Sequence, residues 1–159
     1  MNETPGSDAW LAQVTEPIIE PERPIIDPHH HLWRKRFGRD YLLDDLWQDT
    51  ASGHNIKQTV FIECRAFYDK EAEPHWQSLG ETRVITEIAR KSQQQTEQPA
   101  INGIVAKIDL TLGDKPALLK EIIQTHQQVA GDLFKGVRFA GARDARPEDL
   151  TTPLQALPY

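Results

Sequence analysis

The 159-residue sequence has one cysteine, so it cannot form an internal disulfide bond. It has no apolar run near the roughly 18 residues that a membrane span needs. Basic residues are also few, because 18 Lys and Arg stand against 24 Asp and Glu, a net charge of −6. Nucleic acids and anionic membranes bind basic surfaces, so we expect neither as a partner. The cysteine content favours a reducing compartment, and we expect a cytoplasmic protein.

The start of the chain is acidic and rich in proline. The first 22 residues contain five acids and no Lys or Arg, unlike a secretory signal or an Arg-rich transit peptide. Four prolines precede residue 25, so we expect residues 1–24 to form an extended leader. The remaining length suits one domain, and we expect it over residues 25–159.

Short apolar runs alternate with amphipathic segments along this domain. This order predicts an α/β fold with parallel strands and connecting helices. We expect strands at 25–27, 59–62, 103–108 and 133–139, and helices at 41–52, 81–95 and 116–131. Between the second strand and the second helix, residues 64–79 are expected to form a long loop.

Three of the six histidines are consecutive, in the segment Asp27-Pro28-His29-His30-His31-Leu32-Trp33. Side chains alternate in an extended segment, so His29 and His31 should point one way and His30 the other. Two imidazoles on one face can bind a divalent metal such as zinc. Asp27 is a candidate to orient one of these rings. A surface histidine cluster without function is the alternative interpretation.

Other polar residues interrupt or end the apolar strands. Glu63 follows the second strand, and we expect it to hold a substrate hydroxyl or help to bind the metal, or to be a solvated charge. Arg138 follows the fourth strand as a candidate clamp for a substrate carboxylate, or as part of a structural ion pair. Lys107 either assists charge stabilisation or extends to solvent. Cys64 is interpreted as a small buried residue, not a nucleophile.

Several of these segments, in this order, resemble the amidohydrolase superfamily. The similarity is greatest to its branch of TIM-barrel hydrolases that includes lactonases (the amidohydrolase 2 type). The segments that carry it are Ile25–Trp33, Ser52–Asn55, Val60–Arg65, Gly80–Thr82, Gly103–Val105, Asp109–Leu110 and Lys135–Arg138.

The resemblance implies a hydrolase that directs water at a lactone or amide-like carbonyl of a small molecule. His29 and His31 match the histidine pair that binds a divalent metal, zinc or a similar ion, although some relatives need none. A TIM barrel needs about 250 residues, so the four expected strands correspond to the N-terminal half. The superfamily's later ligands and its general base have no match in the sequence, so the catalytic residues remain unknown.

Three interpretations follow from these observations. In the first, the chain is the N-terminal half of such an enzyme and is inactive alone. In the second, it is a non-catalytic half-barrel that binds metal weakly or completes a partner. In either case self-association or pairing with a C-terminal half-barrel is expected, because four strands leave two open edges. In the third, the chain is a flavodoxin-like domain. The sequence lacks the glycine-rich phosphate-binding loop that such a domain would have after its first strand.

Overall fold

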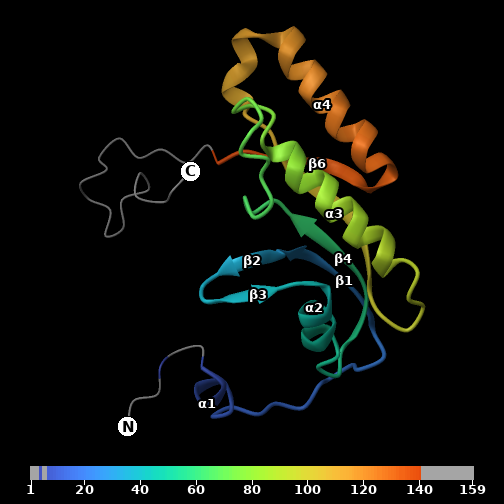
Figure 1. The fold of residues 1–159 in the computed structure, drawn as a ribbon. Helices are drawn as coiled ribbons and strands as arrows, with labels where there is room; N and C mark the ends of the chain where they lie inside the picture. The colour runs from blue at the N-terminus through green and yellow to red at the C-terminus, as the bar shows by residue number, and fades with distance from the viewer. Residues whose placement is uncertain (1–3, 5–6, 141–159) are drawn as a thin grey trace.

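A computed structural model of the chain describes residue 4 and residues 7–140 (Figure 1). Its main sheet has four parallel strands in the order β1-β4-β5-β6. These strands are β1 (Pro24–His30), β4 (Asn55–Ile62), β5 (Ala100–Lys107) and β6 (Phe134–Arg138). The helices are α1 (Asp8–Leu11), α2 (Leu43–Thr50), α3 (Ser78–Ser92) and α4 (Pro116–Ala130), with 3-10 turns η1 (Leu110–Asp114) and η2 (Gly131–Leu133). The predicted alternation of parallel strands and helices is therefore confirmed.

The strands begin or end beyond the apolar runs that predicted them. β1 continues to His30, and β4 begins at Asn55, four residues before its β-branched segment. Backbone pairing explains both differences, because Pro24 lies opposite Asn55 and His30 lies opposite Phe61. A parallel ladder is held by main-chain hydrogen bonds, so residues outside an apolar run can extend it.

A two-stranded antiparallel hairpin, which the sequence reading missed, follows β1. Its strands are β2 (Trp33–Arg36) and β3 (Arg39–Tyr41), and the turn includes Phe37 and Gly38 with positive φ angles of 53° and 78°. The rings of Trp33 and Tyr41 stack with their centroids 4.9 Å apart. The leader also differs from expectation, because it contains the four-residue helix α1 before an irregular stretch that reaches β1.

The apolar core lies between the sheet and its helices. α3 packs against β5 and α4, and these helices lie side by side (Figure 1). One buried cluster joins side chains from α2, α3, the end of α4 and the strands. Its members are Leu32, Leu46, Phe61, Ile85, Ala89, Ile101, Ile104, Ala130 and Leu133. The three longer helices therefore cover the same face of the sheet.

A buried histidine connects α3 to α4. His126 is fully buried, and its Nδ1 lies 2.8 Å from Thr82 Oγ1 while its Nε2 lies 3.5 Å from Ser78 Oγ. Burial lowers its pKa to about 4, so the ring is neutral near neutral pH. This histidine lies inside α4, within the helix that the sequence predicted over 116–131.

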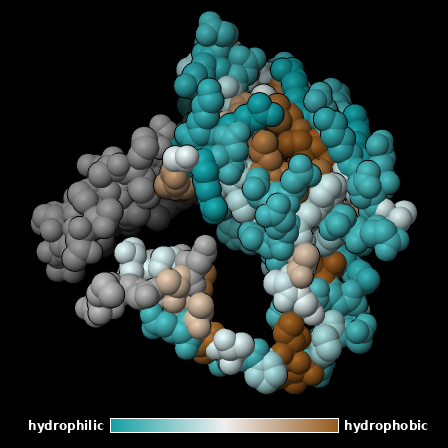
Figure 2. Space-filling model, turned by 60° about the horizontal axis from the view of Figure 1, so that its bottom comes forward, coloured by the Kyte–Doolittle hydropathy of each residue, from teal (hydrophilic) through white to brown (hydrophobic). Residues whose placement is uncertain are grey.

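The described residues contain no helix that is long and apolar enough to cross a membrane. Figure 2 shows one face of the molecule, on which hydrophilic side chains predominate and hydrophobic ones gather in a smaller patch.

Gly80 is required by close packing and not by its backbone angles. A Cβ atom at this position would lie 2.7 Å from both Phe67 O and Asp69 N. We expect Gly80→Ala to destabilise the protein by about 1–3 kcal/mol, because the loop before α3 must move. At Gly113 an added Cβ meets nothing within 4 Å, so Gly113→Ala is the matched control. Urea unfolding of both variants checks this, and equal midpoints would contradict it.

Candidate functional site

The strand ends that carry the predicted site residues lie at one edge of the sheet. β1, β4, β5 and β6 are parallel, so their carboxyl ends lie together (Figure 1). His31 Nδ1 lies 2.8 Å from Ile62 O, which joins the end of β1 to the end of β4. Glu63 N donates to Val105 O at 2.9 Å and continues this contact to β5. The residues that follow these strands therefore lie at one edge of the sheet.

The three histidines alternate as the sequence predicted. His29 Nε2 and His31 Nε2 lie 3.2 Å apart, and the two rings meet edge to face. His30 points into the core, where only 7% of its surface is exposed and its ring meets Phe61 edge to face. Burial lowers the pKa of His30 to about 4, against the opposing charge of Asp27. His30 is therefore a neutral core residue, and the other two face the site.

The contact with Ile62 determines the tautomer of His31. A carbonyl oxygen only accepts hydrogen bonds, so Nδ1 must carry the proton and Nε2 keeps its lone pair. Burial lowers the pKa of His31, which also favours this neutral form. Asp27, predicted to orient a ring, instead accepts a hydrogen bond from the backbone nitrogen of His29 at 3.0 Å. The carbonyl of Ile62 takes the orienting role for His31.

The histidine pair matches the spacing of two ligands on one ion. Nitrogens bound to a tetrahedral zinc ion at about 2.0–2.1 Å lie about 3.3–3.4 Å apart, close to the observed 3.2 Å. Within the part of the chain that the structure describes, no group of three or more His, Cys, Asp or Glu side chains completes such a site. The two histidines therefore fit a metal as a partial ligand set.

Glu63 and Arg138 are brought together although 75 positions separate them in sequence. Arg138 Nε donates to Glu63 Oε1 at 2.9 Å, and Arg138 Nη2 donates to Glu63 O at 2.7 Å. The Glu63 side chain is 8% exposed and that of Arg138 is 41% exposed. This is the ion pair that the sequence left open for Arg138. Glu63 Oε2 is buried and has no hydrogen-bond partner among the described residues.

Lys107 and Cys64 also lie at this edge. The Lys107 ammonium lies 4.0 Å from the centre of the Phe139 ring, a cation–π contact that orients it along the sheet edge. Cys64 is partly buried, and its Sγ donates to Leu32 O at 3.3 Å. Burial and the neighbouring Glu81 raise the pKa of this thiol to about 12. A thiol that stays protonated is a poor nucleophile.

Glu81 is a buried carboxylic acid that the sequence reading quoted but did not assign. Its Oε1 accepts hydrogen bonds from the backbone nitrogens of Cys64 at 3.2 Å and Ala66 at 2.8 Å. Between these two lies Arg65, whose φ of 62° is costly for a residue with a side chain. Glu81 thus holds the chain at the end of β4. Burial raises its pKa to about 7, against the effect of these hydrogen bonds.

A groove of about 520 Å³ opens between the hairpin and the ends of β4 and β6. It contains His31, Glu63 and Arg138, and basic and aromatic residues form its rim. The other lining residues are Trp33, Arg36, Phe37, Cys64, Arg65, Phe139 and Ala140.

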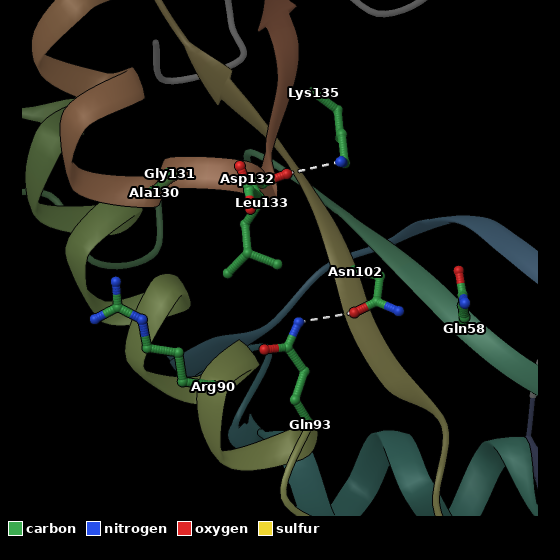
Figure 3. A pocket seen from close by; sticks show the side chains of 9 residues that line it. All are labelled: Gln58, Arg90, Gln93, Asn102, Ala130, Gly131, Asp132, Leu133 and Lys135. Atoms are coloured by element: carbon green, nitrogen blue, oxygen red, sulfur yellow. Dashed lines mark hydrogen bonds between the residues drawn. The ribbon is translucent and has the colours of Figure 1, made fainter.

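A separate pocket lies at the opposite edge, where α3 and α4 end (Figure 3). Its polar groups bond to one another: Gln93 Nε2 donates to Asn102 Oδ1 at 2.8 Å, and Lys135 Nζ donates to Asp132 O at 2.7 Å. None of the predicted site residues lines it. In α/β proteins, sites lie at the carboxyl ends of the strands, so the groove beside the hairpin is the candidate site.

Comparison of the chain with protein families, with curated proteins and with solved structures found no match. The assignment of function therefore depends on the geometry described above.

The pH dependence of stability provides a test of the Glu81 contact. A raised pKa means that the folded protein binds this proton more tightly, so stability falls as pH rises from 4.5 to about 7. His30 and His126 act oppositely, because their lowered pKa values make stability rise between pH 4 and 6.5. We therefore expect maximum stability near pH 6.5.

Replacement of Glu81 by Gln keeps an acceptor oxygen but removes the titration. We expect Glu81→Gln to be more stable than the original protein at pH 8, by roughly 1–3 kcal/mol, and similar at pH 5. Glu87→Gln, at an exposed position of the same helix, is the control. It should leave the stability unchanged at both pH values. Urea unfolding at the two pH values measures this. A loss of stability in Glu81→Gln at pH 8 would show that the carboxylate is required.

Proposed function

We propose that this chain forms part of a metal-assisted hydrolase of the amidohydrolase type, acting on a lactone or amide-like carbonyl of a small molecule. The observation that carries this proposal is the convergence of His29 Nε2 and His31 Nε2, 3.2 Å apart at the carboxyl end of β1. The carbonyl of Ile62 fixes the tautomer of His31 so that its lone pair faces the same point. Hydrogen bonding of the second ring nitrogen is typical of histidines that bind metals.

The arrangement of the sheet supports a half-barrel within this proposal. The strand order β1-β4-β5-β6 follows the chain without reversal, and side chains from the three longer helices share one core cluster. A TIM barrel repeats this pattern eight times, with all helices outside. A flavodoxin-like sheet instead reverses its order after the first strands and has helices on both faces. The four strands therefore correspond better to the first half of a barrel.

His29 and His31 would hold the metal through their Nε2 atoms. A bound divalent metal supplies a water molecule made acidic enough to attack, and it polarises the carbonyl. A catalytic zinc site normally has three protein ligands, so we assign the further ligand and the general base to residues outside those described.

Glu63 and Arg138 would orient the substrate. The orphaned Oε2 of Glu63 is a buried acceptor at the groove that contains His31, and a substrate hydroxyl would satisfy it. Arg138 holds Glu63 through Nε and Nη2, and its Nη1 can donate to a substrate oxygen. We therefore assign Glu63 to hydroxyl recognition and Arg138 to the placement of Glu63 and of a substrate oxygen or carboxylate.

A second candidate function is a non-catalytic half-barrel that binds metal weakly or completes a partner. The observation that favours it is the partial ligand set, because only two imidazoles converge among the described residues. Two ligands bind a metal more weakly than three. The two functions therefore differ in metal affinity and in turnover.

Calorimetric titration of the chain with zinc ions at pH 7.5 tests the metal site. We expect one zinc ion per chain and at least about tenfold weaker binding in His29→Ala and in His31→Ala. His54→Ala is the control, because His54 is exposed and precedes β4 at the other edge of the sheet. Unchanged binding in either site variant would refute the metal assignment.

Lactone hydrolysis by the zinc-loaded chain then separates the two functions. Turnover that His29→Ala abolishes would favour the enzyme, and would place a general base among the residues of this chain. Zinc binding without turnover, the result we expect for the isolated chain, favours a half-barrel that needs further residues for catalysis.

The sheet edges provide a test of the half-barrel itself. Among the described residues, β1 pairs only with β4 and β6 pairs only with β5 in the main sheet, so each has a free edge. We expect the purified chain to sediment as a dimer or larger species at micromolar concentration, or to bind a dye for apolar surfaces. A compact monomer that excludes the dye and unfolds cooperatively would show that the chain closes its own core.

A further inference from the structure

The β2–β3 hairpin places an unusual concentration of positive charge beside the candidate site. Four of its six residues from Arg34 to Arg39 are basic, in a chain with a net charge of −6. The hairpin follows the histidine segment directly and projects from the end of β1 (Figure 1). Its basic residues therefore lie next to the groove that contains His31 and Glu63.

An irregularity within β2 separates these basic residues into two groups. Lys35 has a positive φ of 49°, and its backbone nitrogen donates to Asp40 Oδ1 at 2.7 Å. This positive φ within β2 interrupts the regular alternation of side chains. Arg36 consequently lines the groove and is partly buried, whereas Arg34 is exposed and does not line it.

The groove carries more positive than negative charge. Arg36, Arg65 and Arg138 line it, and Glu63 is its only carboxylate among the described residues. Arg138 is already paired with Glu63. Arg36 makes no salt bridge within the described part of the chain, and its guanidinium carbon lies 5.9 Å from the centre of the Phe37 ring. Arg36 is thus oriented by an aromatic ring while its charge is available to a ligand.

We propose that this groove binds a small-molecule carboxylate, with Arg36 as the residue that recognises the anionic group. This inference rests on the proposed function, because the carboxylate would belong to the substrate whose carbonyl faces His29 and His31. Arg138 is paired with Glu63 Oε1, so Arg36 supplies the positive charge that a substrate carboxylate requires. The planar guanidinium group binds a carboxylate through two parallel hydrogen bonds.

The exposed aromatic residue of the hairpin fits this assignment. Phe37 is 85% exposed, and its ring meets that of Trp33 edge to face at the rim of the groove. Trp33 and Phe37 thus give the groove an apolar wall beside Arg36. A second depression, which shares Arg65, Phe139 and Ala140 with the groove, provides space for the rest of the ligand.

Calorimetric titration of the metal-free chain with citrate, inorganic phosphate and the neutral sugar glucose tests the proposal. We expect citrate to bind most tightly, and Arg36→Gln to weaken citrate binding by at least about tenfold, because a hydrogen bond to a charged group is lost. Arg34→Gln removes the same charge from the same hairpin outside the groove and should change citrate binding less than about twofold. Thermal unfolding of both variants verifies that each is folded.

Two results would overturn the inference. Equal losses in Arg36→Gln and Arg34→Gln would show a diffuse effect of charge, and tighter binding of phosphate or of glucose than of citrate would assign the groove to another class of ligand. Zinc titration of Arg36→Gln separates this inference from the proposed function, because the histidine pair is unchanged in that variant. If Arg36→Gln loses citrate binding but still binds zinc, the result supports both the carboxylate groove and the metal site. Citrate recognition in a chain that does not bind zinc would support the groove and refute the metal site.

Discussion

The hydrogen bond between His31 Nδ1 and Ile62 O organises the whole candidate site. It joins the ends of β1 and β4, so it requires the parallel pairing in which His30 lies opposite Phe61. The same bond fixes the tautomer that directs the lone pair of His31 Nε2 toward His29. A change in strand register by one residue would exchange the buried and the exposed histidines, because side chains alternate with a period of two. The packing of the core and the chemistry of the site therefore depend on one register.

Glu81 extends this constraint from the sheet to the helices. It lies on α3, yet its oxygen bonds to the backbone on both sides of Arg65 at the end of β4. Gly80 lets the same helix approach the loop closely enough for this contact. The loop that carries Arg65 is thus held by a buried acid, and the cost of its positive φ is offset by two hydrogen bonds. The position of the Arg65 charge at the groove therefore depends on how α3 packs against the end of β4.

The sequence predicted those features that depend on local periodicity. The alternation of His29, His30 and His31 follows from extended backbone, and the apolar runs located all four parallel strands. The hairpin was missed because its strands carry polar and basic residues, so no alternation of apolar side chains marks them. The ion pair of Glu63 with Arg138 joins residues 75 positions apart, and only the order of the strands brings them together. Glu81 has an ordinary helical sequence context. Its burial depends on the path of the loop between β4 and α3, which the sequence did not predict.

In the candidate site, neighbouring residues of the same type have different environments and therefore different charges or roles. His30 is buried and neutral, which leaves His29 and His31 as the imidazoles whose Nε2 atoms converge at the strand ends, and His31 lines the groove. Arg138 compensates the buried charge of Glu63, because a carboxylate without a partner is costly to bury. This pairing reduces the charge that Arg138 can offer a ligand, and under the proposal Arg36 of the hairpin would be the stronger determinant of which ligand the groove binds. Under the proposed function, selection of substrate would depend on β2–β3, whereas binding of metal would depend on the histidines at the end of β1, so the two properties could vary independently.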